Sequence, residues 1–185
     1  MKLYIVSIIS LMFMALCLFL SDMIIINASQ SMQKGVYYYA GKSRNKPESR
    51  NNEQKNNKFH SNSIERNRYS YNDIVIYIPE KSIYYFAQNR DYLSNYMAYI
   101  LKLVKGLPGD TIEIVNNILF INQKPNVTIL KYDSKKRKMP VISNKIILKH
   151  NEYFLLSEKE NSFDSRYFGP VLESEIRKVR PLWTW

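Results

Sequence analysis

LKLVKGLPGDTIEI, residues 101–114, holds two apolar, strand-like runs on either side of a Gly-Leu-Pro-Gly-Asp turn. In a strand, Lys102 shares one face with Ile100 and Val104. Lysine usually stays in water because removing its charge from water is costly. Either this run is an edge strand from which the Lys102 ammonium reaches solvent, or Lys102 is buried so that it loses its proton.

Similar strand-like segments, rich in β-branched and aromatic residues and separated by Gly, Pro and Asn, occur along most of the chain. Asn116–Asn117 is a candidate two-residue hairpin turn, whereas residues 174–182 form too short a run to assign. The predicted strands cover residues 23–27, 35–41, 72–79, 82–88, 95–105, 110–115, 118–122, 126–130, 144–149 and 152–157. The pattern predicts a mainly β fold in a single domain.

The composition excludes several kinds of site. Cys17 is the single cysteine, so no intramolecular disulfide forms, and the two histidines, His60 and His150, lie too far apart in sequence to indicate a metal site. We therefore expect no metal and no cofactor. The net charge of +11 suggests nucleic acid or an anionic membrane surface as partner. The basic residues form no aromatic-interleaved stripe, and an AT-rich coding bias gives the same charge, so we expect no nucleic-acid partner.

The N-terminal segment is long and apolar enough for a membrane anchor. Residues 3–20 carry no charge, and a helix of about 18–20 residues crosses a hydrocarbon core of roughly 30 Å. A cleaved signal peptide is the alternative, but its apolar core is shorter and ends in a small-residue cleavage pattern. We expect residues 1–22 to be a cytoplasmic start and a retained single-pass anchor, with residues 23–185 outside the cytoplasmic membrane.

A polar stretch interrupts the expected domain at residues 42–68. It contains eight Lys or Arg residues, three acids, and only Phe59 and Ile64 as sizeable apolar residues. Such a stretch buries too little apolar surface to offset its ordering entropy. We interpret it as a flexible surface insertion, with a functional basic arm as the alternative.

A buried lysine and a nearby serine would make a nucleophilic pair. Desolvation lowers the pKa of a lysine, and a neutral amine acts as a general base. Strand alternation favours Lys102 over Lys105 for this role but does not exclude Lys105. The polar turn at residues 27–35, NASQSMQKG, places two serines shortly after the apolar segment, although a turn serine usually bonds only to backbone.

Three segments in order resemble the signature boxes of type I signal peptidases, which are membrane-anchored Ser/Lys endopeptidases. They are Ser31–Met32, then Lys102 ahead of Gly-Leu-Pro-Gly-Asp (106–110), then Asn-Ser-Phe-Asp-Ser-Arg-Tyr-Phe-Gly-Pro-Val (161–171). The conjugative-transfer branch of that family, the TraF type, is the most similar. The features that point to this branch are Asn27, Gly35-x-Tyr37, Phe154-Leu-Leu-Ser157 and Pro181-Leu-Trp-Thr-Trp185.

The resemblance implies a role for each residue of the site. Ser31 would be the nucleophile and Lys102 the general base, with formation of an acyl-enzyme. Ser29 and the Ser31 backbone N–H would form the oxyanion hole. Two further roles are implied in the last box: Ser165 would orient the lysine amine, and Asp164 and Arg166 would form a structural charge pair. The implied fold is a signal-peptidase-like β module on a single N-terminal transmembrane helix.

The resemblance also implies a function and partners. We expect a membrane-anchored endopeptidase of the bacterial inner membrane, with a periplasmic catalytic domain. It would remove leader peptides from exported precursors, above all a pilin-like subunit of a conjugation or type IV secretion apparatus. The expected partners are the precursor, the lipid bilayer and components of that apparatus.

Two departures keep other functions open. Gln33 stands where the family motif usually has proline, and residues 156–159 (Leu-Ser-Glu-Lys) replace the Gly-Asp-Asn-Arg stretch of general signal peptidases. Glutamine leaves φ free, so a looser turn and lower activity are expected. The alternatives are a general signal peptidase, a catalytically silent assembly protein on the same scaffold, a membrane-tethered nucleic-acid-binding protein, and a Ser-His-Asp hydrolase that uses His150.

Overall fold

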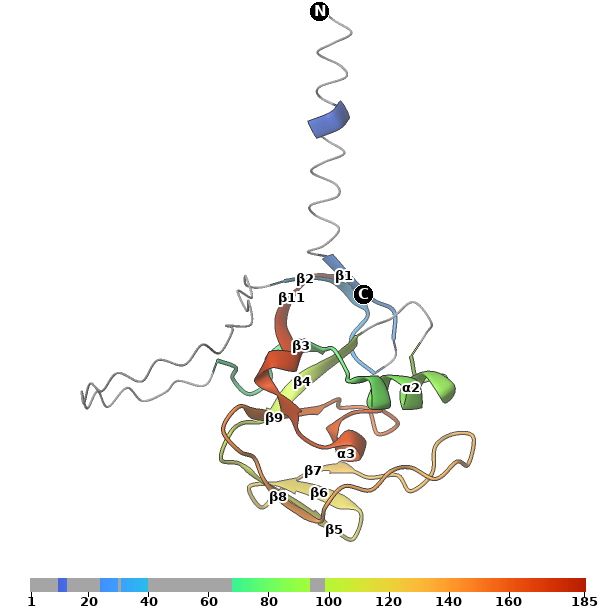
Figure 1. Cartoon of the computed structure of the whole chain (residues 1–185), viewed down its shortest axis with the longest axis vertical. Coiled ribbons are helices and arrows are strands. Elements are labelled where there is room, and N and C mark those ends of the chain that lie inside the picture. Colours follow the sequence, from blue (N-terminus) through green and yellow to red (C-terminus); the bar gives the residue numbers. More distant parts are fainter. Residues whose placement is uncertain (1–9, 13–23, 30, 40–67, 94–98) are drawn as a thin grey trace, which may run out of the picture.

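Figure 1 shows the chain as a computed structural model, which describes residues 10–12, 24–29, 31–39, 68–93 and 99–185. The predicted membrane span (residues 3–20) lies outside the described residues except for residues 10–12, and the predicted insertion (42–68) does so except for Arg68. Among the described residues, no helix has the length and hydropathy that a membrane crossing requires.

Two antiparallel sheets form the described part of the chain (Figure 1). The larger sheet has seven strands in the order β1-β2-β11-β3-β4-β9-β10, and the smaller has four in the order β7-β6-β5-β8. The strands of the larger sheet are β1 (Ile24–Asn27), β2 (Gly35–Tyr39), β3 (Ile74–Tyr77), β4 (Ile100–Gly106), β9 (Glu152–Leu156), β10 (Val171–Leu172) and β11 (Ile176–Thr184). Those of the smaller sheet are β5 (Thr111–Val115), β6 (Ile118–Ile121), β7 (Lys124–Thr128) and β8 (Lys145–Ile147). The predicted mainly β fold is confirmed.

The Gly-Leu-Pro-Gly-Asp segment is the corner at which β4 leaves the larger sheet and β5 enters the smaller one. A Cβ atom on Gly106 would lie 2.7 Å from the Cβ of Phe154, so glycine allows β4 to approach β9 closely. Gly109 has φ of 91°, in the left-handed region that favours glycine. The Asp110 carboxylate then accepts the Leu107 N–H at 2.7 Å and closes the turn.

The predicted hairpin at Asn116–Asn117 is confirmed. Both residues have positive φ, 51° and 64°, and they connect β5 to β6 with Val115 opposite Ile118. This is the geometry of a type I′ turn, whose twist matches that of the flanking strands. A second turn of the same kind, Asn122–Gln123, links β6 to β7. The sequence did not indicate it, because glutamine seldom adopts positive φ.

The strand predicted at residues 82–88 is wrong, because this segment forms helix α2 (Lys81–Asn89). The run Ile-Tyr-Tyr-Phe has high β propensity, which is a weak guide when tertiary packing competes. Ile83 and Ala87, four residues apart, instead face the core together, and Ala87 is fully buried. The Phe86 ring stacks on Phe163 with centroids 5.5 Å apart. Packing of one apolar face therefore decides the helix.

The longest strand, β11, covers the run that was too short to assign from sequence. β11 pairs with β3 through residues 176–178 and with β2 through residues 179–184, with an irregularity between Pro181 and Trp183. Its neighbours are thus about 100 and 140 residues away along the chain, a separation that single-sequence patterns do not carry. β11 joins the N-terminal hairpin to the rest of the larger sheet.

A hydrophobic cluster lies beneath the serine turn and fixes β1, β2 and β4 relative to one another. Its buried members are Ile25, Tyr37, Ile76, Leu101 and Val179. Burying a large apolar side chain contributes about 1.5–3 kcal/mol, so this cluster holds the three strands together firmly. It places the turn that follows β1 beside the middle of β4.

Candidate active site

Lys102 lies in the interior of the larger sheet, since β4 runs between β3 and β9. Lys102 is 2% exposed, and its same-face neighbours Ile100 and Val104 are 5% and 0% exposed. An edge strand would have left the amine in water. The edge-strand interpretation is therefore wrong, and the chain buries this amine.

The Lys102 amine contacts the Ser31 hydroxyl. Lys102 Nζ donates to Ser31 Oγ at 3.0 Å and to the Leu101 carbonyl at 3.1 Å. Burial lowers the pKa of Lys102 from 10.5 to about 8, while the charge of Asp164 raises that pKa and the charge of Arg166 lowers it further. At a pKa of about 8, roughly one molecule in ten holds a neutral amine at pH 7. This amine can act as a base at physiological pH.

Lys105 has a different environment. Its ammonium donates to the Asn72 side-chain oxygen at 2.7 Å, in an exposed position. Lys105 does not line either pocket that Ser31 lines. Of the two lysines that the sequence left open, only Lys102 lies at the serine.

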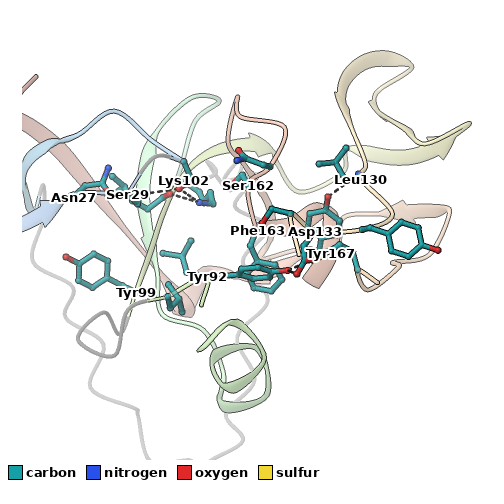
Figure 2. A pocket seen from close by; sticks show the side chains of 18 residues that line it. Asn27, Ser29, Tyr92, Tyr99, Lys102, Leu130, Asp133, Ser162, Phe163 and Tyr167 are labelled. Atoms are coloured by element: carbon teal, nitrogen blue, oxygen red, sulfur yellow. Dashed lines mark hydrogen bonds between the residues drawn. The ribbon is translucent and has the colours of Figure 1, made fainter. Parts of the chain in front are cut away.

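Ser31 and Ser29 occupy the connection between β1 and β2. Ser29 Oγ donates to the Asn27 side-chain oxygen at 2.8 Å and lies 3.2 Å from Ser31 Oγ (Figure 2). Because the Ser29 proton goes to Asn27, Ser31 is the donor between the two hydroxyls in this arrangement. Both predicted serines thus lie within hydrogen-bond distance of one another and beside the buried amine.

Asp164 and Arg166 form a buried ion pair at the start of α3 (Ser165–Phe168). Arg166 Nε lies 2.7 Å from Asp164 Oδ1 and Nη2 lies 2.9 Å from Oδ2, and both residues are fully buried. The Arg166 guanidinium also donates to the carbonyls of Ser157 and Glu160, at 2.9 Å in each case. Two-point pairing compensates both buried charges, and removal of either partner would leave an unpaired charge out of water. The pair orders the loop between β9 and α3.

The two serines of the last sequence box have different environments. The Ser165 hydroxyl accepts the Leu155 N–H at 3.0 Å, and the hydrogen bonds of Lys102 within the described residues go to Ser31 and Leu101. The structure therefore does not bring Ser165 to the lysine amine by a hydrogen bond. Ser162 is 2% exposed, and its hydroxyl has no hydrogen-bond partner among the described residues. Ser162 lines the same pocket as Lys102, and no pattern in the sequence favours it over Ser165.

Ser29 and Ser31 line two adjoining pockets. One, of about 260 Å³, runs past Lys102 and Ser162 to the aromatic rings of Tyr92, Phe163 and Tyr167 (Figure 2). The other, of about 810 Å³, lies along Met32, Lys34 and Trp185. A chain bound across both pockets would pass the Ser31 hydroxyl. Among the described residues, no group of three or more His, Cys, Asp or Glu side chains could hold a metal ion.

Comparison with known proteins assigns the class. The profile of the family described as signal peptidase, peptidase S26, matches residues 2–183. The chain therefore belongs to the signal peptidase family, as its three motifs predicted.

Individual relatives include two conjugation proteins. The chain is 32% identical over 117 residues to the plasmid transfer protein TraF of Escherichia coli, a match that covers 58% of this chain and 66% of that protein. It is 29% identical over 114 residues to the conjugal transfer protein TraF of Agrobacterium tumefaciens, covering 58% and 64% of the two chains. The matched part thus spans slightly less than two thirds of the length of either relative.

A crystal structure of a signal peptidase I from Enterococcus faecalis also aligns with this chain. It is 22% identical with a TM-score of 0.37, and the alignment covers 61% of this chain and 97% of the other.

Proposed function

We propose that this protein is a serine endopeptidase that uses Ser31 as nucleophile and Lys102 as general base. One observation supports the proposal above all: the amine of a lysine that is 2% exposed lies 3.0 Å from a serine hydroxyl that lines two pockets. A buried, partly neutral amine at this distance satisfies the two requirements for a general base, reach and pKa.

The reaction follows from these positions. Neutral Lys102 takes the Ser31 Oγ proton while Oγ forms a bond to the scissile carbonyl carbon. The carbonyl oxygen becomes an oxyanion, which the Ser31 N–H and the Ser29 hydroxyl would stabilise, each donor by about 3–4 kcal/mol. The intermediate expels the new N-terminal amine, which receives the proton from Lys102. Water then attacks the ester on Ser31 and gives a proton to Lys102. The Ser31 Oγ–carbonyl bond breaks, the second product leaves as the acid, and Ser31 Oγ takes the proton back from Lys102.

Two hydroxyl groups assist this cycle in the proposal. Ser29 must turn its proton from Asn27 to the oxyanion, a rotation about one bond. Ser162 lines the pocket of Lys102, and its buried hydroxyl has no hydrogen-bond partner in the described part of the chain, so it is available to orient the lysine amine. We assign it this role in place of Ser165, because within the described residues the hydrogen bonds of Lys102 go to Ser31 and Leu101, and Ser165 instead accepts the Leu155 N–H.

The substrates are, in this proposal, leader-bearing precursors of a conjugation or type IV secretion apparatus, above all a pilin-like subunit. The similarity to proteins named for plasmid and conjugal transfer supports this substrate class. Residues 3–20 would anchor the enzyme in the inner membrane with its catalytic domain in the periplasm. Exposed apolar side chains on β1 and β11, among them Ile26, Leu182 and Trp183 at 59%, 64% and 70% exposure, support contact with the bilayer.

Cleavage of a pilin precursor from the same genome by the detergent-solubilised chain tests the proposal. Ser31→Ala and Lys102→Ala are each expected to lose cleavage by a factor on the order of 10³ or more. Lys105→Ala is the matched control, because it removes a half-buried lysine of the same strand that lines neither pocket of Ser31, and we expect it to cleave like wild type. Ser162→Ala is expected to be slower than wild type through a misoriented amine.

The outcomes separate the alternatives. If wild type cuts a general secretory precursor as well as the pilin precursor, the substrate class is broader than proposed. If it cuts neither, a silent assembly protein is the better description. If Lys102→Ala cuts at the full rate, the Ser/Lys mechanism is wrong, and an unchanged rate in Ser162→Ala would remove Ser162 from it.

A further inference from the structure

The turn that carries Ser31 has no regular secondary structure of its own. Its described residues between β1 and β2 lie outside helices and strands. Gln33 does not restrict φ as the ring of a proline at that position would. An unrestrained turn would let Ser31 Oγ move away from Lys102 Nζ. A displacement of about 1 Å in such a site can reduce the rate about 100-fold. The neighbouring residues show how the turn is restrained.

Asn27 bridges the turn from within. This residue is 3% exposed, and its amide nitrogen donates to the Gln33 carbonyl at 2.9 Å and to the Met32 carbonyl at 3.4 Å. Its side-chain oxygen accepts the N–H of Ser29 at 3.2 Å and the hydroxyl of Ser29 at 2.8 Å. One amide therefore ties both ends of the turn to the last position of β1.

Ser157 holds the nucleophile itself from the other side. Its hydroxyl donates to the backbone carbonyl of Ser31 and accepts the Lys159 N–H at 3.1 Å. The Ser157 N–H donates to Asp164 Oδ2 at 3.0 Å, and the Ser157 carbonyl accepts Arg166 Nη2 at 2.9 Å. Ser157 is 1% exposed and Asp164 and Arg166 are fully buried, so little freedom remains. The Asp164–Arg166 pair therefore fixes the backbone of Ser157, and the Ser157 hydroxyl in turn holds the backbone of Ser31.

Two further contacts complete the set. The Tyr37 hydroxyl donates to the Gln33 carbonyl at 2.7 Å, and burial raises the pKa of Tyr37, which keeps it a donor. The Trp185 N–H donates to the Lys34 carbonyl at 3.1 Å. As a result, each of the four carbonyl groups from Ser31 to Lys34 accepts a hydrogen bond.

We propose that Asn27, Tyr37 and Ser157 form a carbonyl clamp, and that Asn27 and Ser157 are positioning residues that hold Ser31 against Lys102. This inference rests on the proposed Ser/Lys peptidase activity. The clamp acts on backbone carbonyls, so it fixes the turn without using the Ser31 hydroxyl. Asn27 and Tyr37 also form part of the pocket walls, but the atoms that make the clamp are bonded to the turn. Its loss should therefore reduce the rate of the chemical step more than the affinity for substrate.

The test compares Ser157→Ala, Asn27→Ala and Asn27→Asp in the full chain in detergent micelles. Ser143→Ala is the matched control, because the Ser143 hydroxyl also donates to a backbone carbonyl, that of Lys145 at 3.1 Å, but in an exposed loop that lines neither pocket of Ser31. Rates are compared on the high-pH plateau, because a carboxylate at position 27 favours the charged form of a nearby lysine. Asn27→Asp keeps the acceptor for Ser29 and loses the two donors to the carbonyls.

We expect kcat to fall about 10–100-fold in all three variants with KM within about twofold of wild type, and no change in Ser143→Ala. If Asn27→Asp keeps the wild-type kcat, Asn27 acts through Ser29 and not through the clamp. If Ser157→Ala raises KM at unchanged kcat, or matches the control, Ser157 is not a positioning residue.

A second measurement does not depend on activity. When the protein is labelled with ¹⁵N-asparagine, the side-chain amide hydrogens of Asn27 should exchange slowly with solvent. Ser157→Ala should accelerate that hydrogen exchange, because one rigid turn joins the two residues. If wild type cleaves no precursor, the proposed function fails while this exchange still tests the clamp. Rapid exchange in wild type, or exchange unaffected by Ser157→Ala, would overturn the clamp even in an active enzyme.

Discussion

At the scale of single residues, Lys102 is costly to the fold and useful to the site. Lowering its pKa from 10.5 to about 8 corresponds to about 3 kcal/mol of destabilisation of the charged form. The unfolded chain keeps the ordinary pKa, so this penalty is fully present below pH 8 and disappears as pH rises toward 10.5. The same desolvation makes the neutral amine accessible near neutral pH, which is what a general base needs.

The pH dependence of cleavage tests this environment directly. Because only the neutral amine takes the Ser31 proton, kcat/KM should rise about tenfold for each pH unit below 8 and level off above it. A lysine with the ordinary pKa would still be gaining activity at pH 10. Initial rates between pH 6 and 10 on a leader-bearing precursor give the profile. A flat or falling profile between pH 7 and 9 would contradict Lys102 as the base.

At the scale of elements, strand pairing brings the site together more than any one loop does. β4 contributes Lys102, the β1–β2 connection contributes Ser31, and the end of β9 contributes Ser157. Ser31 is 71 residues from Lys102 and 126 from Ser157 along the chain. The spacing of β4 and β9 therefore matters, and it is set by Gly106, where the register of this pair is irregular.

Replacing Gly106 with alanine tests that spacing. The new Cβ would lie 2.7 Å from Phe154 Cβ and 2.9 Å from Leu148 Cδ1, so β4 and β9 would have to separate. We expect destabilisation of about 1–3 kcal/mol from overpacking, measured as a lower urea midpoint. Gly109→Ala is the comparison, because its Cβ would have no neighbour within 4 Å and only its φ of 91° is unfavourable. An unchanged midpoint in Gly106→Ala would show that the close approach is not required.

At the scale of the whole molecule, the C-terminal strand joins the N-terminal hairpin to the rest of the sheet. β11 pairs Trp183 with Val36 and Thr184 with Gly35, and C lies beside β1 in Figure 1. The smaller sheet forms a separate layer that contributes Leu130, Tyr132 and Met139 to the pocket of Lys102 through the connection after β7. The candidate site is thus assembled from segments near the start, in the middle and near the end of the sequence.

Removal of residues 183–185 tests this closure. We expect faster amide hydrogen exchange at residues 35 and 36, because β2 loses its β11 partners Thr184 and Trp183 there and keeps only β1. We also expect cleavage lowered on the order of 10-fold through the displaced turn. Trp183→Ala is the matched control, since it keeps the backbone pairing and removes a side chain that is 70% exposed. If the truncated chain shows wild-type exchange at residues 35 and 36, β11 does not hold the hairpin in place.

The sequence by itself determined the family, the mainly β class, most strand positions and the Asn116–Asn117 turn. These features depend on local residue patterns and on the order of the motifs, and both can be read from one sequence. It also indicated Lys102 by two apolar neighbours, Ile100 and Val104. The assignments of Ser31, Ser29 and the other site residues were implied by resemblance, and their roles stay predictions for the cleavage experiments.

Only the tertiary structure decided whether β4 was an edge or an interior strand, that residues 82–88 fold as a helix, and where β11 pairs. It also separated Ser162, whose buried hydroxyl has no hydrogen-bond partner among the described residues, from Ser165, whose hydroxyl accepts the Leu155 N–H. No pattern in the sequence predicted the contacts of Asn27 and Ser157 with the serine turn. Burial and hydrogen-bond partners depend on strands that lie far apart along the chain, and a local pattern does not record which of them meet.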